Sequence, residues 1–354
     1  MTEFDWGHWI LFSLLILISV LTVVMGFIWY ERRALARLQA RLGPNRAGPF
    51  GLLQPVADVL KVLLKEDIVP AKADKIVHFL APIVALVPAL MIFVVIPFQN
   101  GGSLADLDVG VLYVIAVGSV STLGVFMAGW ASNNKYTIIS AMRDVAAVIS
   151  YEIPLVLSLV GVMLLTGTQA LNTIVITQGE TFPLILTQPL GFLIFFIASL
   201  AEINRTPFDL MEADSEIIAG FHTEYSGMKF ALFYLMEYAE TLAMSALVAT
   251  FFLGGWLGPF LPGWLWLLVK VILVFFVIMW IRAVLPRVRI DQLMSFAWKF
   301  LFPLALLNLT ITAIEVILWP DATALLIPVN IVIAFVLVVL FARNFKLGWG
   351  RVGV

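Results

Sequence analysis

The segment from residue 201 to residue 216 reads AEINRTPFDLMEADSE and decides how the rest of the chain is interpreted. Its acidic character continues to Glu224, so that six carboxylates lie in this region (Glu202, Asp209, Glu212, Asp214, Glu216 and Glu224). Apolar residues flank it, from Leu190 to Leu200 on one side and from Phe230 onward on the other. The pattern predicts an acidic loop over residues 205–232 at a membrane surface, with Glu202 still inside the preceding hydrophobic helix.

The composition predicts an all-α polytopic membrane protein. Hydrophobic residues make up 62% of the 354 residues and charged residues only 12%, about half the charged fraction of an average soluble domain. Several apolar stretches are long enough to cross a hydrocarbon core of about 30 Å as a helix. We predict a single membrane domain over residues 1–354 with nine spans, at about residues 9–30, 77–98, 111–131, 144–166, 184–204, 233–254, 263–285, 298–319 and 324–343.

Cysteine and histidine usage limits the chemistry of the chain. It contains no cysteine, which excludes disulfides, thiolate nucleophiles and cysteine-ligated iron–sulfur clusters. The three histidines (His8, His78 and His222) are far apart and show no metal-ligand or haem-ligand spacing. If the protein takes part in redox chemistry, its partners must hold the electron carriers. The N-terminus is acidic, so residues 9–30 are expected to be an uncleaved first span rather than a signal peptide.

Basic residues predict the orientation of the chain. If the nine spans alternate in direction, all of the 21 Lys and Arg residues except Lys270 fall on one side of the membrane. The loops at 99–110, 167–183, 255–262 and 320–323 contain none. By the positive-inside rule we expect the N-terminus outside and the C-terminus inside, which places the acidic loop inside.

A short interfacial helix is predicted between the first two spans. The turn-rich segment GPNRAGP at residues 43–49 interrupts helical structure. At about residues 50–65, apolar residues then recur at helical spacing (Leu52, Leu53, Val56, Val59, Leu60, Leu63 and Leu64), opposite a polar face (Gln54, Asp58, Lys61 and Lys65). This pattern is typical of an amphipathic helix in the membrane interface. It could simply anchor the loop, or it could line a lateral opening for a lipid-like ligand.

Six carboxylates fall within the predicted spans (Asp144, Glu152, Glu202, Glu237, Glu240 and Glu315). Each costs roughly 2.5–3.5 kcal/mol to insert deep in a helix, so we expect them to face water, to pair or to be protonated. Glu237 and Glu240 are three residues apart and share a helix face, and Asp144 and Glu152 could flank one groove. Basic residues are almost absent from the spans, which argues against ion pairs and favours a hydrated proton path. Hydrogen-bonded packing of the acids is the alternative.

Several motifs occur in order along nearly the whole chain: ER at 31–32, RLGPN at 41–45, GLLQP at 51–55, GWASN at 129–133, ISYE at 149–152, AEINRTPFD at 201–209, GFHTEY at 220–225 and RIDQL at 289–293. With these motifs, the chain resembles the family of H subunits of proton-translocating NADH–quinone oxidoreductase, respiratory complex I. That family includes the mitochondrially encoded subunit 1. Its ninth span is found in only some members.

The resemblance implies roles for particular residues. It implies that the chain forms the membrane side of the quinone-binding chamber, with the first span, the interfacial helix and the sixth span framing the entrance for the quinone tail. Arg32, Arg41 and Arg282 are expected at the chamber and its entrance. The proton path and its coupling to quinone chemistry are expected to use eight acids (Glu152, Glu202, Asp209, Glu212, Asp214, Glu216, Glu224 and Glu237). Asp144 and Glu240 depart from the family pattern and are candidates for additional members.

The resemblance also implies what the chain binds. Quinone is the expected substrate, while NADH, FMN and iron–sulfur clusters are expected in partner subunits and no cofactor, metal or catalytic residue on this chain alone. The expected partners are iron–sulfur and quinone-site subunits of the peripheral arm, small membrane subunits, antiporter-like subunits and lipid, with no nucleic acid. The expected location is a bacterial inner membrane, or an energy-converting organellar membrane, with the basic loops on the cytoplasmic side.

Two other functions compete with this interpretation. One is the equivalent membrane subunit of a membrane-bound hydrogenase or ferredoxin-dependent complex, which need not bind quinone. Neighbouring genes for hydrogenase-like subunits would favour it. The other is a stand-alone secondary transporter, which would predict an internal repeat with broken helices meeting at the membrane midplane. The sequence shows no clear repeat.

The predicted orientation can be tested directly because the chain has no cysteine of its own. Single cysteines introduced at Ser103 and Thr168 should react with a membrane-impermeant thiol reagent from outside, and those at Ser132 and Ser226 only from inside. The asymmetry of Lys and Arg is the physical reason. A cysteine at any of the four positions that reacts from the opposite side would show the orientation to be wrong.

Overall fold

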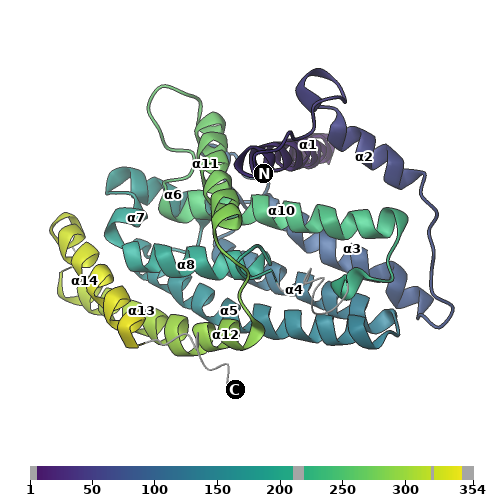
Figure 1. The fold of residues 1–354 in the computed structure, drawn as a ribbon. Helices are drawn as coiled ribbons and strands as arrows, with labels where there is room; N and C mark the ends of the chain where they lie inside the picture. The colour runs from purple at the N-terminus through teal and green to yellow at the C-terminus, as the bar shows by residue number, and fades with distance from the viewer. Residues whose placement is uncertain (1–5, 210–218, 320–322, 345–354) are drawn as a thin grey trace, which may run out of the picture.

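The structure, a computed structural model, describes residues 6–209, 219–319 and 323–344, and within these ranges it contains helices and turns but no β-strand (Figure 1). The helices are α1 (Trp6–Leu38), α2 (Gln54–Leu63), α3 (Lys75–Met91), α4 (Gly110–Ala131), α5 (Lys135–Thr166), α6 (Leu171–Glu180), α7 (Leu184–Thr187), α8 (Pro189–Glu202), α10 (Gly227–Phe252), α11 (Gly263–Val284), α12 (Ile290–Phe296), α13 (Phe302–Leu318) and α14 (Thr323–Asn344). A π-helical turn, Ala297–Leu301, joins α12 to α13.

The chain is an integral membrane protein with eight described helices long and apolar enough to cross a bilayer. These helices cover Ile10–Leu38, Lys75–Val94, Gly110–Ala131, Lys135–Thr166, Gly227–Phe252, Gly263–Val284, Ile290–Leu318 and Leu326–Arg343. They correspond to eight of the nine predicted spans. The predicted all-α membrane fold is therefore confirmed.

The fifth predicted span is divided. Residues 184–204 form the single-turn helix α7 and then α8, which has 14 residues, a length of about 21 Å at 1.5 Å per residue. The break lies at Gln188, whose φ of −133° and ψ of 61° are not helical. Pro189 is the cause, because proline has no N–H to donate and disfavours a helical conformation in the residue before it.

The fourth span begins earlier than predicted, at Lys135 rather than at about residue 144, and α5 has a capping residue at each end. The Asn134 side chain accepts a hydrogen bond from the Tyr136 N–H at 3.0 Å, which is the usual role of an N-cap asparagine. At the other end, Gly167 adopts the left-handed conformation at φ 68° and donates its N–H to the Met163 carbonyl. Glycine accepts this backbone conformation without steric cost. The predicted carboxylates at 144 and 152 therefore lie within α5 rather than near its beginning.

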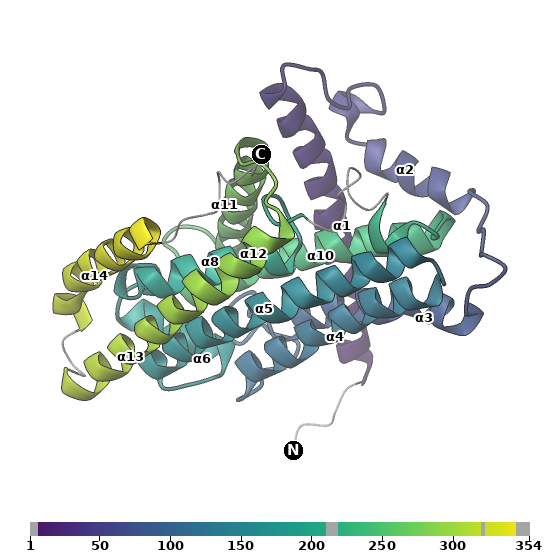
Figure 2. The same cartoon turned by 60° about the horizontal axis from the view of Figure 1, so that its bottom comes forward.

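Five helices form the body of the bundle. In Figures 1 and 2, α3, α4, α5, α8 and α10 lie side by side, α1 and α11 pack on one side of them, and α2 stands apart near α1. At one end of the molecule α14 packs against α7 and α8, next to α13. The predicted amphipathic helix is α2, and its apolar residues Leu52, Leu53, Val56, Val59, Leu60, Leu63 and Leu64 are all exposed on the protein surface.

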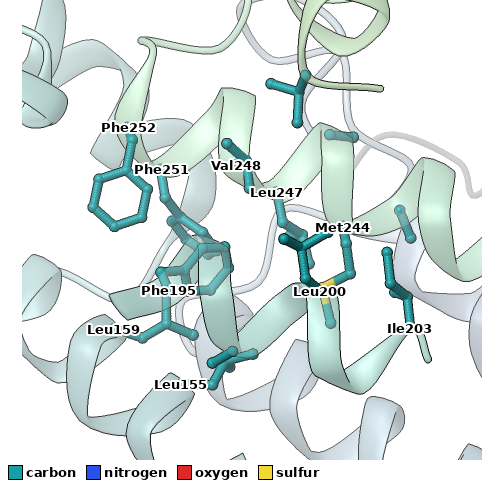
Figure 3. Close-up of a cluster of buried hydrophobic side chains, with 14 of the residues drawn as sticks. Leu155, Leu159, Phe195, Leu200, Ile203, Met244, Leu247, Val248, Phe251 and Phe252 are labelled. Carbon is teal, nitrogen blue, oxygen red and sulfur yellow. The ribbon is translucent and has the colours of Figure 1, made fainter. Parts of the chain in front are cut away.

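Helix α10 is the centre of this arrangement. Every residue from Thr241 to Phe252 is buried. Figure 3 shows α10 packed through Met244, Leu247, Val248, Phe251 and Phe252 against side chains of α5 and α8. Phe195 of α8 contacts two of these aromatic rings, with a centroid separation of 6.0 Å to Phe251. The two glutamates of α10, Glu237 and Glu240, lie near the middle of the helix, directly before this enclosed stretch, and both are partly buried.

Candidate functional site

The helix that leads into the acidic segment ends in a tight turn around Asn204. The Arg205 N–H donates to the Leu200 carbonyl and the Asn204 N–H to the Ala201 carbonyl, both at 3.2 Å, which is the Schellman arrangement of a helix C-terminus. Asn204 has the left-handed conformation that this turn requires, with φ at 51°, and asparagine adopts it more readily than most residues. The turn leaves the Arg205 side chain inside the protein, where the residue is 3% exposed.

Arg205 lies between carboxylates from two different helices. Its Nη1 is 3.3 Å from Oε1 of Glu31 on α1, and its Nε is 3.3 Å from Oε1 of Glu237 on α10. The guanidinium carbon lies 4.4 Å from the centre of the Tyr238 ring. Arg282, near the end of α11, forms an ion pair with the same Glu31 oxygen. These four charged residues, Glu31, Arg205, Glu237 and Arg282, are called the ion-pair network.

The ion-pair network balances two positive against two negative side chains at a buried place. Burial by itself would lower the pKa of the Arg205 guanidinium, but Glu237 and Glu31 together raise that pKa above its usual range. Arg205 therefore stays charged at any physiological pH. Removing one member of a buried ion pair is costly because it leaves an uncompensated charge. The network consequently fixes α1, the turn after α8, α10 and α11 relative to one another.

This network corrects one expectation from the sequence. The scarcity of basic residues within the spans argues against ion pairs, and that inference is wrong for Glu237. Its partner Arg205 follows α8 directly and enters the bundle from the turn at its end. A long guanidinium side chain reaches an acid on a neighbouring helix although its own backbone lies outside a span. Counting charges span by span misses this contact.

A second set of acids continues from Glu237 into the interior. On α10, Glu240 is within electrostatic range of Glu202, Asp144 and Glu237, and Glu202 is within range of Glu152. These acids come from α5, α8 and α10, and the set of five is called the carboxylate chain. The structure therefore brings together Asp144 and Glu240, to which the family pattern assigns no role, with three acids to which the resemblance does assign one.

Small and polar residues surround the carboxylate chain. The Ser119 hydroxyl donates a hydrogen bond to Glu152 Oε1, and the Ser121 hydroxyl interacts with Glu240. Gly118 faces Glu202, since a Cβ at that glycine would lie 3.5 Å from Glu202 Oε1. Within the described residues no Lys or Arg pairs with Glu152, Glu202 or Glu240. Acids without basic partners at this depth are stable when hydrated or protonated.

A small cavity connects the acidic segment to the carboxylate chain. It has a volume of about 30 Å³, enough for one or two water molecules. Its lining includes Asp209 and His222 on one side and Glu237 and Glu240 on the other, together with Asn204. Water in this position would be within reach of acids from the loop and from α10.

The remaining predicted acids are placed in different surroundings. Asp209 pairs with Arg287 at 3.0 Å between Oδ2 and Nη2, beside the buried turn of residues 207–209. Glu224 accepts a hydrogen bond from the Asn134 amide at 2.7 Å, which ties the end of the acidic loop to the start of α5. Glu212, Asp214 and Glu216 lie outside the described residues.

The three predicted quinone-site arginines do not form one group. Arg32 on α1 pairs with Asp58 of α2 and interacts with Tyr234 of α10, so it joins three helices. Arg282 belongs to the ion-pair network through Glu31, the residue next to Arg32. Arg41 lies in the exposed turn after α1, where its Nε donates to Gln39 Oε1 at 2.7 Å.

Sequence reasoning misses two central residues, Glu31 and Arg205. Both occur in the quoted motifs, but neither receives a role from them. The available signal is their position, because each lies within a few residues of the end of an apolar run. Both residues are 3% exposed and they contact each other. The sequence does not indicate this contact, because the two positions are 174 residues apart.

The sequence is similar to known proteins of one family. Residues 11–313 match a family model described as NADH dehydrogenase. Curated relatives include an H subunit of NADH-quinone oxidoreductase from Dehalococcoides mccartyi, 58% identical with all of both chains covered. Another is the protein of the same description from Brevibacillus brevis, 49% identical, for which the match covers 88% of this chain and 95% of the relative.

The ion-pair network predicts a large effect of one substitution. Arg205→Met should destabilise the protein by about 3–5 kcal/mol, because Glu237 loses its charged partner and Glu31 keeps only Arg282. Arg289→Gln is the matched control, since Arg289 pairs with Asp291 at an exposed position where such a pair contributes about 1 kcal/mol or less. Thermal unfolding of the purified complex measures both. Equal melting temperatures for the two variants would contradict the structural role of Arg205.

Proposed function

The chain belongs to the NADH dehydrogenase family, among the H subunits of NADH–quinone oxidoreductase, and from this we propose that it forms part of the quinone chamber and couples quinone reduction to proton translocation. The observation that carries the proposal is the continuity of the ion-pair network with the carboxylate chain through Glu237 and Glu240. One end of this series lies at the acidic segment and the other end lies inside the bundle. Such a series is suited to convert a change of charge at one end into proton movement at the other.

The entrance for the quinone is proposed to lie where α1, α2 and α10 meet. Arg32 supports this because it interacts with Asp58 and Tyr234, one residue on each of the other two helices. Ser226, just before α10, is hydrogen-bonded to the backbone at Glu66 and Ile68, which follows α2. The apolar residues of α2 are exposed and provide a surface that suits the hydrocarbon tail of a quinone.

The chemistry of quinone reduction supplies the signal. A quinone becomes a quinol by taking up two electrons, which come from redox centres in partner subunits, and two protons. Negative charge therefore appears near the inner ends of the helices before the protons arrive. Arg282 and Arg205 respond to this charge because they are the cations that share the carboxylate of Glu31.

When the negative charge on the quinone attracts the arginines, their electrostatic interaction with the carboxylates becomes weaker. The carboxylates then take up protons more readily. Glu237 is paired with Arg205 and within electrostatic range of Glu240, so a proton that arrives at one of them changes the proton affinity of the next. Interacting acids titrate as a coupled set rather than individually. In this mechanism the chain carries no redox centre and supplies charge, orientation and proton transfer.

The proposed setting follows from the same family membership. We infer a bacterial inner membrane, with the N-terminus outside and the basic loops in the cytoplasm, and partners that carry NADH, FMN and iron–sulfur clusters. The carboxylate chain would then deliver protons toward the remaining membrane subunits. The description of the curated relatives as quinone oxidoreductase subunits favours quinone over the hydrogenase alternative.

The coupling role predicts the effect of Glu202→Gln. This isosteric change removes an acid from the carboxylate chain but keeps its shape, so the complex should assemble. Quinone reduction and proton pumping should fall together by about tenfold. A decrease of this size corresponds to a loss of about 1.4 kcal/mol of stabilisation in the rate-limiting step. Glu180→Gln, at the exposed end of α6, is the control and should keep wild-type rates. Assembled Glu202→Gln complexes with normal turnover and normal proton stoichiometry would contradict the coupling.

The chamber assignment predicts a different signature for Arg282→Ala. Glu31 keeps Arg205 as a partner in this variant, so assembly should be retained. The Michaelis constant for quinone should rise several-fold, because a cation beside the chamber is lost. Steady-state kinetics with short-tailed and long-tailed quinones measure the effect, with Arg289→Ala as the exposed control. Unchanged quinone kinetics in an assembled Arg282→Ala complex would show that Arg282 does not line the chamber.

A further inference from the structure

A second polar group lies at the opposite end of α5 from the residues already described. Here the break between α7 and α8 meets α13 and α14, at the end of the molecule where these helices gather (Figures 1 and 2). Six polar residues from these helices line a common cavity (Thr187, Gln188, Asn308, Thr312, Glu315 and Asn330). Glu315 is the only carboxylate among them and is 8% exposed. The proposed quinone and coupling functions use none of these residues.

Hydrogen bonds organise this group around the break in the fifth span. The Asn330 amide donates to Glu315 Oε2 at 3.1 Å and to the Thr187 carbonyl at 2.8 Å. Thr187 is the last residue of α7, and terminal carbonyls of a helix need partners from outside it. On the other side, the Gln188 amide donates to the Thr312 hydroxyl at 3.1 Å. The break caused by Pro189 therefore creates a polar place within an apolar bundle.

Two cavities meet at Glu315. One is small, with a volume of about 20 Å³, and is lined by Gln188, Asn308 and Thr312 together with Glu315. The other has a volume of about 290 Å³ and extends along Thr166, Gly167 and Trp319 at the ends of their helices. Glu315, Asn330 and Thr187 line both cavities. Glu315 consequently forms part of the wall between a smaller and a larger cavity.

The unsatisfied atoms of the smaller cavity match a water molecule. Among the described residues, the buried atoms Gln188 Oε1 and Asn330 Oδ1 are acceptors without a partner, and Asn308 Nδ2 is a donor without one. A water molecule can accept from one donor and donate to two acceptors, and a volume of about 20 Å³ is enough for one water. Gln188 and Asn308 are 3% and 5% exposed, so bulk solvent does not satisfy these atoms.

Glu315 has no charged partner in the described part of the chain. Among the described residues, neither cavity is lined by another Asp or Glu, or by Lys, Arg or His. An unpaired carboxylate in a membrane span is costly unless it is hydrated or protonated. Its side chain accepts a hydrogen bond from the Asn330 amide, and amide donation is compatible with either protonation state.

We propose that Glu315 is a proton-exchange site, which takes up a proton from water in the larger cavity at the Thr166 end of α5 and returns it to the same water. The site is independent of quinone binding and of the carboxylate chain, and its ligand is a proton. By the predicted orientation this end of α5 faces outside. The geometry thus gives the chain a second place where protons enter or leave the membrane.

Carbodiimide labelling of the intact complex in sealed vesicles tests this proposal, because carbodiimides react with protonated carboxyl groups. A water-soluble carbodiimide added on the Thr166 side should modify Glu315, as detected by mass spectrometry of the peptide, and the modification should fall as the pH is raised. Glu180 lies on the same side and serves as the internal standard for reagent access. Modification of Glu315 only from the opposite side, or from neither side at any pH, would overturn the proposal.

Thr166→Phe provides the matched variant, because Thr166 lines the larger cavity and a phenyl ring at this position would occupy part of it. It should reduce the labelling of Glu315 several-fold and leave that of Glu180 unchanged. Equal labelling of Glu315 in the variant and in the wild type would overturn the assigned route. Protection of Glu315 by sodium ions, but not by choline at the same ionic strength, would show a cation site in place of the proton site.

Discussion

The buried position of Arg205 constrains the rest of the structure. A guanidinium that is 3% exposed in a bundle of apolar helices needs compensating charge at short distance, and the compensation comes from Glu31 and Glu237 on two other helices. Once these contacts form, the ends of α1, α8 and α10 have little freedom to slide, and Arg282 adds α11 to the same assembly. The acids that follow, from Glu240 inward, then have defined neighbours. Their arrangement depends on the turn at Asn204 that puts Arg205 inside.

The local elements of the fold are predictable from residue patterns, and the contacts between them are not. Apolar runs of about 20 residues determine membrane helices almost independently of context, which is why eight spans agree with prediction. The amphipathic spacing of Leu52 to Leu64 similarly predicts α2. Pro189 indicates the break at Gln188. Residues 184–204 are nevertheless apolar and long enough to cross a membrane, so the pattern predicts one continuous span. Burial, in contrast, depends on which helices pack together. The ion pair between Glu31 and Arg205 joins two segments whose sequences give no indication that they are in contact.

The candidate site shows the same division. The acidic segment and the acids within spans indicate where chemistry is to be found, since a charge in a hydrophobic span is expensive. The residue pattern does not distinguish acids held by arginine, such as Glu237, from acids that lack a basic partner in the described structure, such as Glu202 and Glu240. That distinction comes from the C-terminal turn of α8 and from the enclosure of α10. Asp144 and Glu240, which the family pattern leaves without a role, are joined to the other acids only by their proximity.

The enclosure of α10 also bears on how the protein is made. Of the eight spanning helices it is the least apolar, and it carries both Glu237 and Glu240, so an isolated α10 would enter a bilayer poorly. During synthesis, however, α1 with Glu31 and the turn with Arg205 precede it, and the cation that neutralises Glu237 is therefore already in place when α10 emerges. Arg282 follows only with α11. The order of the charged residues along the chain thus places Arg205, the partner of Glu237, in the protein before α10 is synthesised.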